Sequence, residues 1–297
     1  MKVVALMPVR NEAWVLGFSA RVALMWCDEI VFASHWPEDR SHDIMNELAA
    51  DYPGRVTIRE DRSQQWHEMR QRQMLLECAR ERGATHIALV DADEVLTANL
   101  LDGGGFGHCC PKGMIETGSG VLQLPGYNLR GSLNRYHSNG IWANRWFSVA
   151  FSDDKRLHWG GDKFHQREPR GMKLELHRPI AQGEGGVLHL WGVSERRLVA
   201  KHSWYKVTER IRFPEKAVSE IDRMYNLAIK GEFKQPTWGT PATWTYAEVP
   251  EAWLSPYARL MQYLDIDATP WQEEETRRLV REHGREAFNG LDLFGVV

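Results

Sequence analysis

The chain has 297 residues, 43% of them hydrophobic and 26% charged, and its formal net charge at pH 7 is −3. This length accommodates one large domain, or one domain with an appendage, and the composition is that of a globular protein. The slightly negative charge argues against a nonspecific nucleic-acid binder, and no apolar run is long enough to span a bilayer.

Two features predict a cytoplasmic location. The N-terminal apolar stretch is short and runs straight into Arg10, so it lacks the plan of a signal peptide. The four cysteines show no C-x-x-C spacing, and we interpret them as reduced thiols of a cytosolic protein.

Strand and helix patterns alternate over the first hundred residues. We expect strands over 2–9, 29–34, 56–59 and 86–90, and helices over 12–26, 41–51 and 64–82. Such alternation is typical of an α/β fold with a Rossmann-like, mostly parallel sheet flanked by helices. Ligands bind beyond the carboxyl ends of strands in these sheets. The loops 9–12, 34–40 and 91–94 are therefore expected at one edge.

The pattern changes after residue 100. Strands are expected over 120–127, 144–151 and 187–191, and helices over 194–208, 214–230 and 270–287. The segment 235–256 is irregular and rich in Pro and Trp. We therefore predict an α/β domain over residues 1–215 and a helical, Trp-rich C-terminal extension over 216–297.

Three acids follow the strand expected at 86–90. Asp91, Asp93 and Glu94 lie within four residues, and burying carboxylates together is costly unless a cation compensates them. Hard oxygen ligands favour Mg²⁺ or Mn²⁺. Asp91 and Asp93 point the same way in extended geometry, so one ion could contact both. The competing interpretation is an ordinary strand end with solvated acids.

Several segments together resemble the family-2 glycosyltransferases of the GT-A fold, in particular the bacterial branch with a D-A-D-E motif. They are, in chain order, Pro8-Val9-Arg10-Asn11-Glu12, Arg72-Gln73, Asp91-Ala92-Asp93-Glu94, Phe164-His165-Gln166, Val187-Leu188-His189-Leu190-Trp191-Gly192 and Lys201 with Tyr205. The resemblance covers roughly residues 1–215, and 216–297 resembles no known family.

The resemblance implies a nucleoside diphosphate sugar donor, one Mn²⁺ or Mg²⁺, and transfer of a hexose to a hydroxyl with inversion. It implies Asp93 as a metal ligand, with Asp91 and His189 as further candidates. The residues implied for donor binding are Pro8, Val9, Arg10, Asn11, Glu12, Ser34, Asp39, Arg72, Asp91 and Ala92. The sequence His35-Trp36-Pro37-Glu38 departs from the family's usual D-x-S-x-D type loop, which leaves the nucleobase open.

The catalytic base is the least defined element. The branch carries an acid beside its first paired His, but this chain has Gln166 there. We expect Asp162 to be the base, because its neighbouring glycines permit close approach of a substrate, and Glu168 is the nearest acid downstream. Trp159 and Trp191 are expected to offer aromatic faces to the acceptor.

Other functions stay open. A noncatalytic binder of sugar nucleotides or glycans is favoured if the base is absent. A nucleotidyltransferase would usually carry a Gly-rich loop after its first strand, which this chain lacks. The acceptor is a glycan or another hydroxyl compound. A hydroxylated DNA base is a further possibility, because arginines that could contact phosphates are interleaved with tryptophans between residues 130 and 178.

Overall fold

The computed structural model describes residues 1–63, 67–101, 120–161, 166–172, 175–230, 232–234 and 241–297. Its contacts divide the chain into two compact units. The first unit comprises residues 1–127, 144–189 and 250–265, and the second comprises 128–143, 190–249 and 266–297. This division differs from the boundary expected at residue 215, because the chain crosses between the two units several times.

Four parallel strands form one half of the main sheet in the first unit, and they confirm the predicted α/β fold. Their order is β3-β2-β1-β4. Their bounds are Val3–Val9 for β1, Glu29–Ser34 for β2, Val56–Glu60 for β3 and His86–Leu89 for β4. All residues of β2 are buried, and β1 is buried except at Pro8. These two strands therefore form the centre of the core.

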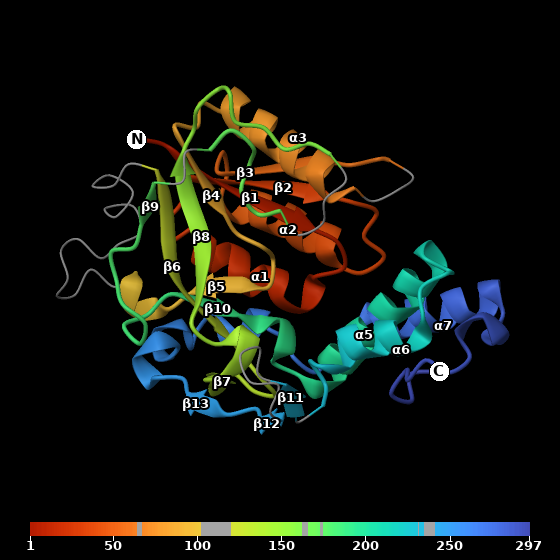
Figure 1. Cartoon of the computed structure of the whole chain (residues 1–297). Helices are drawn as coiled ribbons and strands as arrows, with labels where there is room; N and C mark the ends of the chain where they lie inside the picture. The colour runs from red at the N-terminus through yellow and green to blue at the C-terminus, as the bar shows by residue number, and fades with distance from the viewer. Residues whose placement is uncertain (64–66, 102–119, 162–165, 173–174, 231, 235–240) are drawn as a thin grey trace. The chain divides into compact units, whose positions relative to one another are not determined.

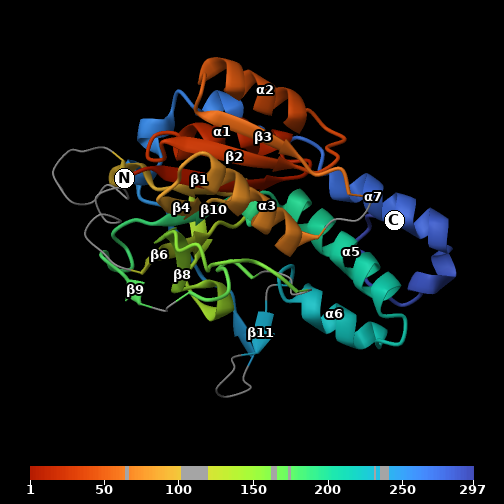
Figure 2. The same ribbon diagram turned by 90° about the horizontal axis from the view of Figure 1, so that it is seen from above.

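Helices cover both faces of these strands (Figures 1 and 2). They are α1 (Ala13–Ala23), α2 (Ser41–Asp51) and α3 (Glu68–Glu81), in agreement with the apolar periodicity of the sequence. Leu16 of α1 and Leu48 of α2 pack on one face, where they meet Phe32 of β2. Leu76 of α3 packs on the opposite face.

The other half of the sheet is antiparallel where strand pairs are described, apart from one short strand, and the sequence did not predict this. Beyond β4 the order is β8-β6-β10-β5, and β9 pairs with β6 in parallel. The bounds are Glu94–Leu96 for β5, Val121–Asn128 for β6, Arg145–Ser152 for β8, Leu176–His177 for β9 and Val187–His189 for β10. The β5–β10 pair follows directly on the acid motif, and this placement determines the geometry of the site.

A late segment of the chain also belongs to the first unit. It contains η4 (Glu251–Trp253), η5 (Ser255–Tyr257) and η6 (Met261–Tyr263), and it packs near η1 (Ala98–Leu100). The Tyr257 ring lies edge-on to that of Phe18, 5.7 Å between centroids, and its hydroxyl donates to the Leu96 carbonyl at 2.9 Å. Residues 250–265 are thus part of the first unit and contribute to its core.

The second unit is built from helices and two small antiparallel sheets. The helices are α5 (Glu195–Arg212), α6 (Val218–Asn226), α7 (Trp271–His283), η2 (Gly140–Trp142), η3 (Leu190–Gly192) and η7 (Arg285–Phe288). The sheets pair β7 (Arg135–His137) with β13 (Tyr246–Glu248), and β11 (Glu232–Lys234) with β12 (Pro241–Thr243). Within the described part of the chain, no helix combines the length and the apolar character needed to cross a membrane.

Candidate active site

The acid motif forms a tight turn between β4 and β5. The Glu94 amide donates to the Asp91 carbonyl at 3.0 Å, which closes the turn. Val90 and Ala92 are 6% and 4% exposed and anchor it in the core. The predicted donor-binding residue Ala92 thus has a structural role. Asp91 and Asp93 alternate with these apolar anchors, and their side chains are 30% and 14% exposed.

Strand pairing brings His189 to the same turn. In the antiparallel β5–β10 pair, His189 lies directly opposite Glu94. Its Nε2 atom is 3.5 Å from Oδ1 of Asp93, and its ring meets the edge of Phe147, 5.6 Å between centroids. The structure therefore brings together two of the three residues predicted as metal ligands.

Asp91, the third predicted ligand, is bound by two arginines. Arg72 on α3 donates from Nη2 to Asp91 Oδ1 at 3.2 Å and from Nε to Glu68 at 3.0 Å. Arg167 donates from Nη1 to the other Asp91 oxygen, also at 3.2 Å. Burial raises the pKa of Asp91, but these two guanidinium groups outweigh burial and hold the pKa below its usual value.

Arg167 is the centre of this network. It donates to both carboxylate oxygens of Glu94, at 2.7 and 2.6 Å, as well as to Asp91. Its remaining bonds go to the carbonyls of Leu89 at 2.8 Å and Ser148 at 2.7 Å. A guanidinium has five N–H donors, and all five of these have acceptors. Arg167 thus ties β4, β5 and β8 together beneath the acid turn.

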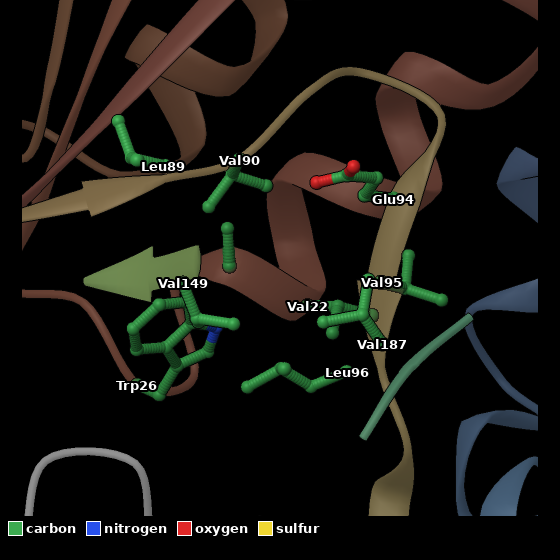
Figure 3. Close-up of a pocket in the computed structure, with 10 residues that line it drawn as sticks. Val22, Trp26, Leu89, Val90, Glu94, Val95, Leu96, Val149 and Val187 are labelled. Carbon is green, nitrogen blue, oxygen red and sulfur yellow. The ribbon is translucent and has the colours of Figure 1, made fainter. Parts of the chain in front are cut away.

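Glu94 lies against a small apolar cavity. The cavity has a volume of about 10 Å³, and its lining includes Trp26, Val90, Val95 and Val149 (Figure 3). Such a volume holds at most one water molecule. Burial raises the pKa of Glu94, and the charge of Arg167 offsets this only in part. Glu94 therefore has a structural role and is not a ligand open to substrate.

A divalent cation fits Asp93 and His189. A carboxylate oxygen with a neutral imidazole nitrogen suits Mn²⁺, and Mg²⁺ commonly takes one or two carboxylates together with substrate phosphates. Among the described residues, no group of three His, Cys, Asp or Glu side chains is arranged to hold a metal ion. The expected set of three protein ligands is not formed, because the Asp91 oxygens face Arg72 and Arg167.

Three of the residues predicted to bind the donor lie at the end of β1. Val9 pairs with Ser34 across β1 and β2, and these residues are 2% and 3% exposed. Their side chains are therefore closed to a ligand. Pro8 and Arg10, on either side of Val9, are only partly buried. Of these residues, Pro8 and Arg10 therefore remain accessible to a donor.

Asn11 and Glu12 turn the chain from β1 into α1. Asn11 has a left-handed backbone (φ 54°), and its Oδ1 accepts from the Glu38 amide at 2.7 Å. Its amide nitrogen is buried with no hydrogen-bond partner among the described residues. Glu12 accepts from the Trp14 indole at 2.8 Å. Asn11 therefore retains a donor group, while one carboxylate oxygen of Glu12 is occupied.

Asp39 links two loops through backbone contacts. Its two oxygens accept from the amides of Ala13 at 2.9 Å and Ser41 at 2.8 Å. These are the first residues of α1 and α2, so Asp39 satisfies amides that have no partner within their helices. The carboxylate expected to contact the donor is thus used to fix the loop.

Trp36 is the exposed aromatic residue of this edge. Its side chain is 57% exposed, its φ is 40°, and its indole N–H donates to the Ser63 carbonyl at 2.9 Å. His35 beside it is buried and lies 3.2 Å from the same carbonyl oxygen. A left-handed backbone is strained for a bulky side chain. The Trp36 ring therefore lies at the protein surface, beyond the carboxyl end of β2.

The predicted base, Asp162, lies outside the described residues, as does His165. The alternative acid, Glu168, is described and partly buried. The hydroxyl of Ser148 donates to its Oε1 at 2.5 Å. Glu168 also follows Arg167 directly, so its backbone is attached to the acid network.

The two tryptophans predicted to bind the acceptor occupy different units. Trp159 is 4% exposed and packs against Phe151, 6.3 Å between centroids, so it offers no open face to an acceptor. Trp191 belongs to the second unit. It is partly buried, and its indole donates to Asn128 at 2.8 Å.

Sequence reasoning missed Arg167 and Glu68 as members of the site. Arg167 was grouped only with arginines that could contact phosphates. Glu68 precedes Arg72 by one helical turn, a spacing that favours an ion pair, and this signal was available in the sequence. No local pattern connects Arg167 to Asp91, because the contact depends on the pairing of β4 with β8.

Comparisons with known proteins gave distant structural likenesses. No family model matches the chain, and no curated protein does. The structure of S. aureus TarS 1–349 in complex with UDP-GlcNAc is 11% identical with a TM-score of 0.45, and the match covers 97% of this chain and 90% of that one. The complex of S. aureus TarS 1–349 with UDP is 16% identical with a TM-score of 0.35, over 44% of this chain and 37% of that one. Matches at this level assign neither a family nor an activity.

Proposed function

We propose that the first unit is a glycosyltransferase that moves a hexose from a nucleoside diphosphate sugar to a hydroxyl acceptor with inversion. The observation that carries the proposal is the contact between Asp93 and His189 at the carboxyl end of β4, beside the Arg72–Asp91 pair. This is the edge of a parallel sheet at which nucleotides bind, and it collects the polar groups that a diphosphate and its cation require.

The residues have separate tasks in this proposal. Asp93 and His189 hold Mn²⁺ or Mg²⁺, which when bound neutralises charge on the departing diphosphate. Trp36, with its exposed ring, contacts the nucleoside, whereas Asn11 is buried beneath this edge. Arg72 and Arg167 hold the acid turn in one conformation.

The bond changes balance as a single displacement. The bond between the anomeric carbon and the diphosphate oxygen breaks, and its electron pair leaves with the nucleotide. The acceptor oxygen bonds to the opposite face of that carbon, and its proton passes to a carboxylate base. We assign the base to Asp162, because its neighbouring glycines permit close approach of a substrate. The described alternative is Glu168, whose Oε1 accepts a hydrogen bond from Ser148.

The acceptor we favour is a glycan. Some of the arginines between residues 130 and 178 that could contact DNA phosphates are paired with acids of this chain: Arg130 with Glu195 at 2.9 Å, and Arg167 with the acid turn. Arg156 pairs with Asp154. This leaves fewer charges for a nucleic acid than the sequence suggested.

Incubation of the protein with nucleoside diphosphate sugars and Mn²⁺, followed by detection of released nucleotide, tests the activity. Release that depends on metal and on Asp93 supports a transferase. A noncatalytic binder would bind the donor without releasing nucleotide, and the replacement of the family's acid by Gln166 is the observation that favours this second candidate.

A further inference from the structure

We propose that Arg167 is a positioning residue that withholds Asp91 and Glu94 from metal, so that the acid turn and its strand partner β10 leave Asp93 and His189, among the described residues, to bind a divalent cation. The other coordination positions of the cation are then open to water and to the donor's diphosphate. The part concerning the nucleotide rests on the proposed function, whereas the part concerning metal ligation does not.

Hydrogen bonds to Glu94 and Asp91 hold the guanidinium group of Arg167 in one position. Its side chain is 17% exposed, and it forms the shortest bonds of the network, to the two oxygens of Glu94 at 2.7 and 2.6 Å. Its third carboxylate bond, to Asp91, is 3.2 Å. A bidentate arginine–carboxylate pair is strong and directional, so a cation would have to displace it to reach either acid.

The two arginines compensate part of the negative charge of the network without a metal. Glu68, Asp91 and Glu94 carry three negative charges, and Arg72 and Arg167 carry two positive charges. The need for a compensating cation at Asp91 and Glu94, which the acid motif alone suggested, is thus partly met by the protein. Breaking such a buried pair on one side leaves a charge uncompensated, which is strongly destabilising.

Asp93 is not among the carboxylates that Arg167 binds. It lies 3.5 Å from Nε2 of His189, and both side chains are partly exposed. Two protein ligands satisfy a minority of the positions around Mn²⁺ or Mg²⁺, and substrate phosphates commonly supply others. Cation and nucleotide should therefore each bind weakly alone and strengthen each other, by an equal factor in both directions.

A titration of Mn²⁺ followed by electron paramagnetic resonance tests the inference without nucleotide or turnover. The variant is the double substitution Arg167→Met and Glu94→Gln, which removes one positive and one negative charge together and frees Asp91 from Arg167. We expect Mn²⁺ to bind this variant roughly 10-fold or more tightly than the wild type, a change comparable with other alterations around bound metals.

A second buried arginine pair in the same unit is the matched control. Arg80 on α3 binds Asp153 through two nitrogens at 2.9 and 2.8 Å, near the start of β4 and not its end. The double variant Arg80→Met and Asp153→Asn should leave Mn²⁺ affinity unchanged. Circular dichroism confirms that each variant is folded.

Unchanged or weaker Mn²⁺ binding by the folded Arg167 double variant overturns the inference. If that variant does not fold, Arg167→Lys replaces it, because lysine keeps the charge but cannot span two carboxylates. We then expect a smaller gain in Mn²⁺ affinity than for the double variant. The absence of any gain in affinity would contradict the inference. Repeating the wild-type titration with UDP, GDP, CDP and dTDP separates the two proposals. If the Arg167 variant binds Mn²⁺ more tightly but no nucleotide changes the Mn²⁺ affinity of the wild type, the role of Arg167 is upheld and the proposed function is rejected.

Discussion

His189 Nε2 lies 3.5 Å from Asp93 Oδ1, although the two residues are far apart in the sequence. The antiparallel β5–β10 pair produces this contact, because β5 begins at the last acid of the motif and places His189 opposite Glu94. The imidazole is thus carried by β10, and the carboxylate by the hydrogen-bonded turn that directly precedes β5.

Replacing Asp93 should remove cation binding and leave the fold intact. Asp93→Asn keeps the shape of the side chain but loses its charge, and only His189 remains as a strong ligand. We expect donor turnover to fall at least about 100-fold, a typical loss when charge stabilisation at the leaving group is removed. Asp154→Asn, at an acid paired with Arg156, should behave as the wild type. Turnover by folded Asp93→Asn at the wild-type rate would contradict the metal assignment.

The catalytic base is tested by comparing two acids. Asp162→Asn should lower kcat by roughly 100- to 10,000-fold, the usual contribution of a positioned base, with little change in donor binding. Glu168→Gln should have a much smaller effect, because an amide oxygen still accepts from Ser148. The reverse pattern, measured by steady-state kinetics, would transfer the role to Glu168.

Trp36 should contribute to nucleotide binding and not to stability. Its ring is 57% exposed, so Trp36→Ala removes little packing. Base stacking on an aromatic side chain is worth about 1–3 kcal/mol, so we expect the donor Kd to rise roughly 5- to 100-fold and the melting temperature to stay nearly constant. Trp36→Phe should retain part of the affinity. Equal donor affinity in all three proteins, measured by calorimetry, would make Trp36 a bystander.

Two buried histidines should make the second unit acid-sensitive. Burial lowers the pKa of His137 and of His202 to about 4. A histidine in the unfolded chain has a pKa near 6.5. Between pH 6.5 and pH 4 the unfolded state therefore binds more protons than the folded state. The free energy of unfolding falls as the pH is lowered through this range. Each residue contributes at most about 3 kcal/mol. Urea unfolding at pH 7 and pH 5 measures the loss, which should shrink in His137→Phe. An equal loss in that variant would exclude His137 as a source.

The sequence predicted the elements of the first unit well, because their signals are local. The periodicity of α2 and the alternation around β4 reflect burial against immediate neighbours in the chain. The antiparallel half of the sheet was not predicted, since its order depends on pairing between distant strands. For the same reason Arg167 and its bonds to Asp91 and Glu94 were missed.

The roles predicted for the site residues stay predictions, but the structure shows where the described ones lie. Asp93 and His189 lie 3.5 Å apart, and Arg72 reaches the acid turn. Asp39 was expected to contact the donor, but its carboxylate fixes the starts of α1 and α2. Trp159 was expected at the acceptor, but it is buried. Residue type and spacing suggest what a side chain can do, whereas its partners in space determine which of these it does.

The most direct test of the proposed function is a thermal-shift panel. UDP-, GDP-, CMP- and dTDP-sugars are added to the protein with Mn²⁺ and, separately, with a chelator. A ligand that binds only the folded state raises the melting temperature by mass action. We expect one nucleotide to raise it with Mn²⁺, and this rise to be lost with the chelator and in Asp93→Asn. No shift with any donor under either condition would contradict the assignment of a sugar-nucleotide site to the acid turn.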